Sequence, residues 1–277
     1  MEIKFQNVEY SYSKNGKKVL DGVNIKIGKE RITGITGPSG SGKTTLIEMI
    51  NALRIPTKGK VIVGDVIVSK KKKIEDIKKF RSKIGMVFQF PEEQFFCDTV
   101  DKEIAFGLEQ FHYEIEENVI LAMEMVDLDM SFLSRDPFSL SNGEMRKVAI
   151  ASALAYNPEV LILDEPTIGL DMASKKSLIK VLTTIKARYK KTIIIVSHDV
   201  DFICKVADDT IVLKDGNVLV SGKSIDVFKE ESLLQENDIS VPRTITFSNY
   251  VLKEKNIYLG YRSEVNDLVK DILRHVK

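Results

Sequence analysis

This 277-residue sequence has few cysteines, a net charge close to zero and no long apolar run, and each of these features excludes a class of protein. The 2 cysteines, Cys97 and Cys204, are too few for a disulfide framework and lack metal-site spacing, which is typical of a reducing cytosol. With 41 basic against 40 acidic side chains, no general attraction to nucleic acid is expected. No apolar run approaches the roughly 18 residues of a membrane span, and the charged, alternating start MEIKFQNVEYSY is not a signal peptide.

What the sequence does contain is an alternation of strand and helix patterns. The start alternates apolar and polar positions as short antiparallel strands do, and RITGITG predicts a strand leading into a glycine-rich turn and the helix KTTLIEMINAL. Residues 101–136 change to helical spacing, after which the strands 160–163 and TIIIVSH alternate with helices. We therefore expect an α/β fold with a mainly parallel sheet, an N-terminal antiparallel β subdomain and a helical insertion at about residues 95–157.

The C-terminal part of the chain has a looser periodicity. We expect a main domain of residues 1–222 and a small C-terminal extension of residues 223–277. Within the extension, DISVPRTI predicts a linker into a final amphipathic helix, which packs either on its own domain or in a dimer contact. The apolar stripe of that helix consists of Val265, Leu268, Val269, Ile272, Leu273 and Val276.

Residues 37–44, GPSGSGKT, match the phosphate-loop pattern G-x-x-x-x-G-K-[ST] between an expected strand and an expected helix. The glycines let backbone N–H groups face phosphates, Lys43 reaches the β and γ groups, and the Thr44 hydroxyl can bind Mg²⁺. A glycine-rich structural turn is the alternative, which this strand and helix context disfavours. The expected nucleotide-binding residues of the loop are Gly37, Pro38, Ser39, Gly40, Ser41, Gly42, Lys43, Thr44 and Thr45.

Polar side chains also follow three other expected strands. Asp164 and Glu165 follow an apolar strand, where an aspartate can organise magnesium and a glutamate can orient or deprotonate the attacking water. Gln89 follows IGMVF and His198 follows TIIIVS. Taken alone, an Asp-Glu pair is often a helix N-cap, and a lone histidine or glutamine is uninformative. Because ligands of open parallel sheets bind beyond the carboxyl ends of the strands, we expect all of them at one site.

A second anion site is indicated a hundred residues after the phosphate loop. Ser141, Asn142 and Gly143 precede a helix that is expected to start near Glu144, so backbone N–H groups and a serine hydroxyl point out of a helix N-terminus. A chain with a complete phosphate loop needs no second site for the same phosphates. The question is which anion this second site binds.

The ordered motifs GPSGSGKT, VFQ, LSNGE, LILDEP, IGLD and VSHD resemble the ATP-binding subunits of ABC transporters over roughly residues 3–222. The resemblance implies two domains that dimerise head to tail, with Ser141, Asn142, Gly143 and Glu144 capping the ATP held by the other subunit. It also implies a role for each of several other residues. Tyr12, or its rival Tyr10, stacks on adenine. Thr44, Gln89 and Asp164 are the magnesium ligands, and Gln89 also joins magnesium to the transmembrane partner. Glu165 is the catalytic base, Lys43 and His198 take part in catalysis with His198 contacting the γ-phosphate, and Asp171 couples the two sites.

The loop resembling the family's Leu-Ser-Gly-Gly-Gln departs from it at two positions. Asn142 replaces glycine and tolerates a left-handed backbone better than most residues. Glu144 replaces glutamine, and its carboxylate suits a helix N-terminus but repels a nearby phosphate. The ATP site that this loop completes on the partner is expected to be weakened, whereas the site built on Lys43 and Glu165 is intact. This difference between the two ATP sites favours a heterodimer.

Within the family, VFQFPEEQFFCDTVDKEIAFGL and LSNGEMRKVAIASALA most resemble the energy-coupling-factor importers of vitamins and transition-metal ions. The resemblance implies Mg²⁺ with ATP, a second ATPase subunit, a membrane scaffold subunit and a separate substrate-binding membrane subunit, with no nucleic acid. It places the chain at the cytoplasmic face of the membrane. Phe95 and Phe96 are either core residues or part of the groove for the scaffold's helices, and the lysine run 70–73 is expected to be a solvated loop.

Four other functions compete with this one. A soluble ABC ATPase acting on ribosomes or DNA usually has two cassettes or a long coiled-coil insertion, and neither pattern is present. A P-loop kinase needs an arginine-rich lid, which residues 100–140 do not supply. The altered LSNGE loop alone suggests a nucleotide-sensing module without catalysis, and an ATPase subunit of another ABC transporter also fits the motifs.

Overall fold

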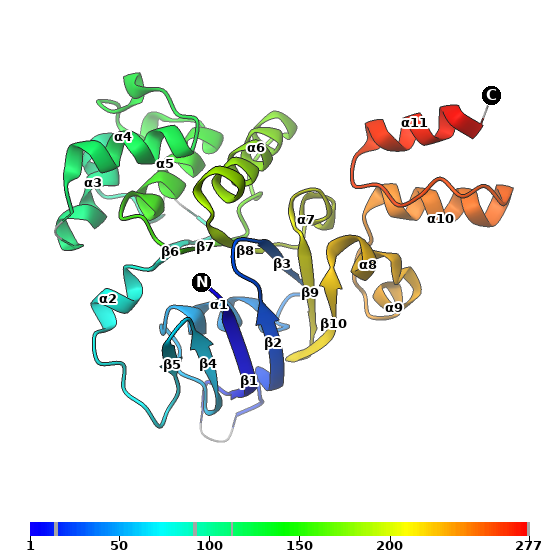
Figure 1. Ribbon diagram of the computed structural model, residues 1–277, viewed down its shortest axis with the longest axis horizontal. Coiled ribbons are helices and arrows are strands. Elements are labelled where there is room, and N and C mark those ends of the chain that lie inside the picture. The colour runs from blue at the N-terminus through cyan, green and yellow to red at the C-terminus, as the bar shows by residue number, and fades with distance from the viewer. Residues whose placement is uncertain (14–15, 91–92, 112, 276–277) are drawn as a thin grey trace.

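The computed structural model describes residues 1–13, 16–90, 93–111 and 113–275, which form two β-sheets with helices around them (Figure 1). The smaller sheet is antiparallel, in the order β2-β1-β4-β5. Its strands are β1 (Ile3–Tyr10), β2 (Leu20–Ile27), β4 (Lys58–Val63) and β5 (Val66–Val68). This is the expected N-terminal antiparallel subdomain, and it is confirmed.

The larger sheet of the described chain has six strands in the order β10-β9-β3-β8-β7-β6. They are β3 (Ile32–Thr36), β6 (Ile84–Val87), β7 (Val160–Asp164), β8 (Thr192–Val196), β9 (Asp209–Lys214) and β10 (Asn217–Lys223). All neighbouring pairs are parallel except β9 with β10. The expected mainly parallel α/β sheet is therefore confirmed.

Both faces of the large sheet are covered, which explains why its central strands are continuously apolar. Along β7, Val160 and Ile162 point into a core shared with α1 (Lys43–Ile50) and the small sheet. Leu161 and Leu163 point into the opposite core, under the helices. The period-2 alternation of a strand thus divides one apolar run between two cores.

The helical insertion and the C-terminal helices lie at opposite ends of the large sheet, near β6 and β10 respectively (Figure 1). The insertion contains α3 (Val100–Phe111), α4 (Ile115–Met125), the short turns η2 (Met130–Phe132) and η3 (Pro137–Ser139), and α5 (Asn142–Ala155). The other helices of the domain are α2 (Ile77–Arg81), α6 (Met172–Tyr189) and α7 (Val200–Val206). Phe95 is buried in the core of the insertion, whereas Phe96 is 62% exposed.

The C-terminal segment contains more helix than its looser periodicity suggested. Before α11 (Val265–His275) the chain forms α8 (Ser224–Lys229), α9 (Glu231–Glu236) and α10 (Arg243–Lys255). The prediction of a linker over DISVPRTI was wrong in its last residues, because α10 begins at Arg243. α8 and α9 are six residues each, too short to display a helical period, and they are held by burial of Phe228 and Leu234 with α7.

The final helix keeps an apolar face in solvent. Val265, Val269 and Leu273 are each exposed by 45% or more, whereas Leu268 is buried. Val276, the last member of the predicted stripe, lies outside the described residues. Within the described ranges, every helix is too short or too polar to cross a bilayer.

Candidate functional site

The phosphate loop joins β3 to α1 and depends on glycine at particular positions. Gly37 has φ of 142°, and a Cβ there would lie 2.0 Å from the carbonyl oxygen of Leu213. Gly42 caps α1 with φ of 100°. Both values fall in the left-handed region that side chains disfavour. The loop also holds a buried Ser41 Oγ that has no hydrogen-bond partner among the described residues.

Lys43 lies at the first position of α1 and folds back over this loop. Its Nζ donates hydrogen bonds to the carbonyl oxygens of Gly37 and Pro38, both at 2.8 Å. Burial lowers the pKa of Lys43, while the nearby carboxylates of Glu165 and Asp164 oppose that shift. A phosphate oxygen is a better partner for a buried ammonium group than two neutral carbonyls, so the lysine is poised to bind one.

Asp164 ends β7 beside the first turn of α1. The Thr44 hydroxyl donates to its Oδ2 at 3.2 Å, and the aspartate is buried at 6% exposure. Burial raises the pKa of Asp164 to about 6, although the Thr44 hydrogen bond and Lys43 oppose the rise. A hydroxyl and a carboxylate oxygen this close, with Gln89 on the same pocket wall, fit the oxygen preference of Mg²⁺.

Magnesium needs few protein ligands when it is bound together with phosphates. Among the described residues no cluster of three or more His, Cys, Asp or Glu side chains is placed to hold a metal without such help. The Thr44 and Asp164 pair therefore suits a cation that arrives with a nucleotide.

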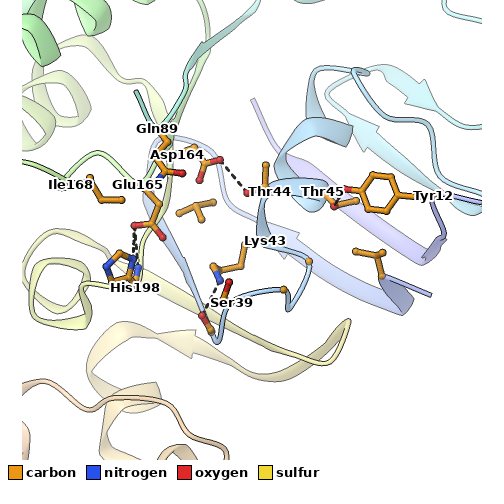
Figure 2. A pocket seen from close by; sticks show the side chains of 15 residues that line it. Tyr12, Ser39, Lys43, Thr44, Thr45, Gln89, Asp164, Glu165, Ile168 and His198 are labelled. Atoms are coloured by element: carbon orange, nitrogen blue, oxygen red, sulfur yellow. Dashed lines mark hydrogen bonds and ion pairs between the residues drawn. The ribbon is translucent and has the colours of Figure 1, made fainter. Parts of the chain in front are cut away.

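Glu165 turns out of the strand through a left-handed backbone, with φ of 48°. This conformation is uncommon for a residue with a side chain and is found at functional sites. The turn directs its carboxylate to His198, whose Nδ1 lies 3.0 Å and whose backbone nitrogen lies 3.3 Å from Oε2 (Figure 2). Because His198, which follows β8, contacts the Glu165 carboxylate, the orientation of that carboxylate is set within the protein itself.

Tyr12 occupies the opposite side of the phosphate loop from Glu165 and His198 (Figure 2). Its hydroxyl lies 2.9 Å from Thr45 Oγ1, and the Arg54 guanidinium lies 5.0 Å from its ring centroid. The side chain is 61% exposed, whereas its rival Tyr10 is 9% exposed and packs in the core. The structure thus leaves Tyr12, and not Tyr10, available for stacking on a base.

These groups line one cavity of about 530 Å³ at the carboxyl ends of β3, β6, β7 and β8. The predicted site residues that line it are Tyr12, Gly37, Ser39, Gly40, Gly42, Lys43, Thr44, Thr45, Gln89, Asp164, Glu165 and His198. Pro38 and Ser41 belong to the loop but do not line the cavity. Val19, Ile168 and Val196 line it and were not predicted, since nothing distinguishes them from other apolar positions in the sequence.

The Ser141 loop lies at a separate cavity of about 270 Å³, which contains none of the groups above. Ser141 caps α5, and Glu144 completes a capping box by accepting from the Ser141 backbone nitrogen at 2.9 Å and from its hydroxyl at 2.6 Å. These hydrogen bonds lower the pKa of Glu144. Gly143 packs against α6, where a Cβ would lie 2.7 Å from Ser174 Oγ.

Asn142 is the first residue of α5 and is not among the residues with positive φ, so no left-handed backbone is required there. Its side-chain amide instead donates to the carbonyl oxygen of Gly169 at 3.3 Å. Asp171 is exposed and caps α6 through the Ser174 backbone nitrogen at 2.7 Å. Both residues therefore lie on the loop surface outside the main cavity.

Comparisons with known proteins identify the family of this chain. Residues 20–168 match the family model described as ABC transporter. The chain belongs to the ABC transporter family. The ATP-binding protein EcfA2 of the energy-coupling factor transporter of Enterococcus faecalis is 39% identical, over 99% of this chain and 95% of that protein.

Two solved structures of ABC cassettes share the fold. One is cbiO1 from Clostridium perfringens, part of the transporter complex cbiONQ, with a TM-score of 0.77, 30% identity and coverage of 89% of this chain and 98% of the other. The second is the dimeric cassette MJ0796 in a post-hydrolysis state with ADP and Pi, with a TM-score of 0.70, 29% identity and coverage of 80% and 98%. This chain is accordingly an ABC-type ATPase, and its near full-length relatives are energy-coupling factor subunits.

The buried carboxyl of Asp164 predicts that the free energy of unfolding of the ABC cassette, measured without nucleotide, depends on pH. Since its pKa is raised to about 6, the folded state keeps a proton that the unfolded state releases, and stability falls as pH rises from about 4 to 6. Asp164→Asn removes that decline, so the variant is expected to be more stable above pH 6 by about 1 to 3 kcal/mol. Urea unfolding with EDTA between pH 4.5 and 8 measures the difference.

Asp65→Asn, at an exposed turn residue, is the control for this measurement and is expected to follow the wild-type pH profile. A stability difference between Asp164→Asn and wild type that does not change with pH would contradict the assignment.

The exposed ring of Tyr12 predicts a contribution to ATP affinity through the base alone. Tyr12→Ala is expected to weaken ATP binding about 10-fold, since stacking a base on an aromatic ring is worth about 1 to 3 kcal/mol. Tyr12→Phe keeps the ring, loses only the Thr45 hydrogen bond, and is expected to stay close to wild type. Calorimetric titration with ATP and with inorganic triphosphate measures both, and equal weakening of the two ligands by Tyr12→Ala would rule out stacking.

Proposed function

We propose that this ABC cassette hydrolyses ATP to drive an energy-coupling-factor importer that takes up a vitamin or a transition-metal ion. The observation that carries the proposal is the meeting of Lys43, Asp164 and Glu165 around a phosphate loop, in a chain that matches EcfA2 over nearly its whole length. The residues of the cavity support ATP hydrolysis, and the similarity to EcfA2 supports a role in an energy-coupling-factor importer.

Binding of the nucleotide uses the loop first. Backbone N–H groups of residues 39–44 and the N-terminus of α1 face the phosphates, and Lys43 exchanges its two carbonyl partners for phosphate oxygens. Tyr12 holds the adenine at the far side. Thr44, Asp164 and Gln89 would hold Mg²⁺, which when bound supplies charge neutralisation of the phosphates.

Hydrolysis depends on positioning of water beside the γ-phosphate. The Glu165 carboxylate accepts a proton from the attacking water, or holds the water in line, while His198 keeps that carboxylate oriented and contacts the phosphate. Both residues are set by parallel strands, so the arrangement needs little reorganisation during the reaction.

The anion proposed for the Ser141 cavity is a phosphate held by a partner cassette. Ser141 and Gly143 would cap the γ-phosphate bound by a partner cassette, and Asp171 would contact the partner across the dimer. Glu144 is ionised and holds the Ser141 hydroxyl, so it withholds that donor from a phosphate and adds negative charge beside it. A site completed by this loop would be the weaker of two, which favours a heterodimer with a different ATPase subunit.

The proposed partners also include a membrane scaffold subunit and a separate substrate-binding membrane subunit, with the cassette at the cytoplasmic face of the membrane. Phe96 packs edge-on against Phe106 at a centroid distance of 4.4 Å, and both side chains are exposed. This exposed pair suits contact with helices of the scaffold. The exposed face of α11 suits contact between the two C-terminal segments.

Glu165→Gln tests the chemistry. The amide keeps the size of the side chain but is a far weaker base, so kcat for ATP is expected to fall about 100-fold or more while ATP affinity changes little. Turnover and ATP binding are measured on the complete transporter. Glu159→Gln, at the exposed residue just before the same strand, is the control and is expected to retain turnover; turnover retained in Glu165→Gln would remove that residue from the role.

Affinity purification of the tagged chain from detergent-solubilised native membranes tests the setting. Mass spectrometry is expected to identify a second ATPase, a polytopic scaffold and a small substrate-binding membrane protein. Recovery of the chain only with ribosomes or DNA, or as a soluble homodimer, would leave the ATPase in place and overturn the transport assignment.

A further inference from the structure

Arg146 is a buried arginine that no step described above uses. It lies in the second turn of α5, five residues after Ser141, and is 4% exposed. A guanidinium group stays charged in proteins, and placing it in the interior is costly unless its N–H groups are bonded. The atoms that satisfy it therefore indicate what it holds in place.

Three of its hydrogen-bond partners are backbone carbonyl oxygens on two loops of the nucleotide site. Nη1 donates to Phe88 at 3.2 Å, and Nη2 donates to Gln89 at 3.0 Å. Nη2 also lies 3.4 Å from the carbonyl oxygen of Ile168, three residues after Glu165. Gln89 and Ile168 both line the nucleotide cavity. Because the contacts are with main-chain atoms, Arg146 positions the loops themselves.

The shape of the arginine side chain suits simultaneous hydrogen bonds to both loops. The two terminal nitrogens of a planar guanidinium reach successive carbonyls and a third on another loop at once, which a single ammonium nitrogen cannot do with the same geometry. One turn earlier on the same helix, Asn142 donates to Gly169 at 3.3 Å. The first two turns of α5 are thus attached to the loop after β6 and to the segment after β7.

The same helix begins at Ser141, whose cavity is separate from the nucleotide cavity. The first two turns of α5 carry both Ser141 and the hydrogen bonds to the two loops, so a shift of either loop would act directly on the turn that presents Ser141. Arg146 also forms part of the wall of the Ser141 cavity. It therefore lies between the chain's own ATP site and the surface that would face the partner's ATP.

We propose that Arg146 is a positioning residue that couples the Gln89 loop and the segment after Glu165 to the orientation of Ser141. This coupling rests on the function proposed above. Occupancy of one ATP site, or movement of the Gln89 loop by a membrane partner, is then transmitted through the guanidinium to the cap of the other ATP site.

Arg146→Lys in the complete transporter tests the coupling, because it keeps the charge and loses the fork. We expect kcat for ATP to fall about 10-fold, KM for ATP to change less than about twofold, and substrate uptake per ATP hydrolysed to fall. Arg188→Lys is the matched control, because it makes the same substitution at an exposed arginine of α6 whose guanidinium lies 5.6 Å from the centroid of the Tyr189 ring. This control is expected to keep kcat and the uptake ratio.

Other outcomes overturn the proposal. If Arg146→Lys raises KM with kcat unchanged, the residue contacts phosphate directly; if kcat and the uptake ratio both stay within about twofold of wild type, it couples nothing. A lowered melting temperature with normal kcat per folded complex would assign it a structural role alone. A wild-type complex without ATP hydrolysis would instead contradict the proposed function, so the two failures are distinct.

A second measurement does not depend on folding of the variant. Hydrogen exchange of the wild-type complex with and without ATP is expected to show that residues 86–90 and 141–146 change protection together, whereas residues 115–125 of α4 do not follow them. A change in one of the first two segments without the other would overturn the coupling.

Discussion

Parallel pairing of β6, β7, β8 and β3 is the constraint on which the rest of the molecule depends. Hydrogen bonds between neighbouring strands bring their carboxyl ends to one edge of the sheet, although the four strands are spread over more than a hundred residues of sequence. Gln89, Asp164, Glu165 and His198 meet the phosphate loop only because of that pairing. Burial of both sheet faces then prevents the strands from shifting register, since a one-residue shift would turn each apolar set out of its core.

This rigid edge lets the site hold arrangements that are unfavourable in isolation. Asp164 and Lys43 are both kept where burial disfavours their charged forms, and Glu165 has a left-handed backbone. A bound cation would balance the charge of Asp164, and a phosphate oxygen would be a better partner for Lys43 than its two carbonyls. Burial of these two groups therefore favours a ligand that brings both a cation and a phosphate.

The features that the sequence did not predict are those decided by contacts between distant segments. α8 and α9 carry no visible period, and they fold because Phe228 and Leu234 are buried against α7. Phe95 and Phe96 are adjacent and chemically identical, yet one lies in the core and the other in solvent. Arg146 is one of several basic residues in the sequence, and only its burial against the Gln89 loop distinguishes it. Such outcomes depend on packing partners that are far away along the chain.

By itself the sequence determined the fold class, the phosphate loop and the family, because these depend on local spacing: alternating apolar runs, glycines at required turns and polar residues directly after strands. The tertiary structure alone decided that Tyr12 and not Tyr10 is available to a base, that Glu144 holds the Ser141 hydroxyl, and that α5 is bonded to both loops of the nucleotide site. Local spacing is set by backbone geometry and is visible in one dimension. Exposure and side-chain partnership arise only when separate segments pack, which no short stretch of sequence can specify.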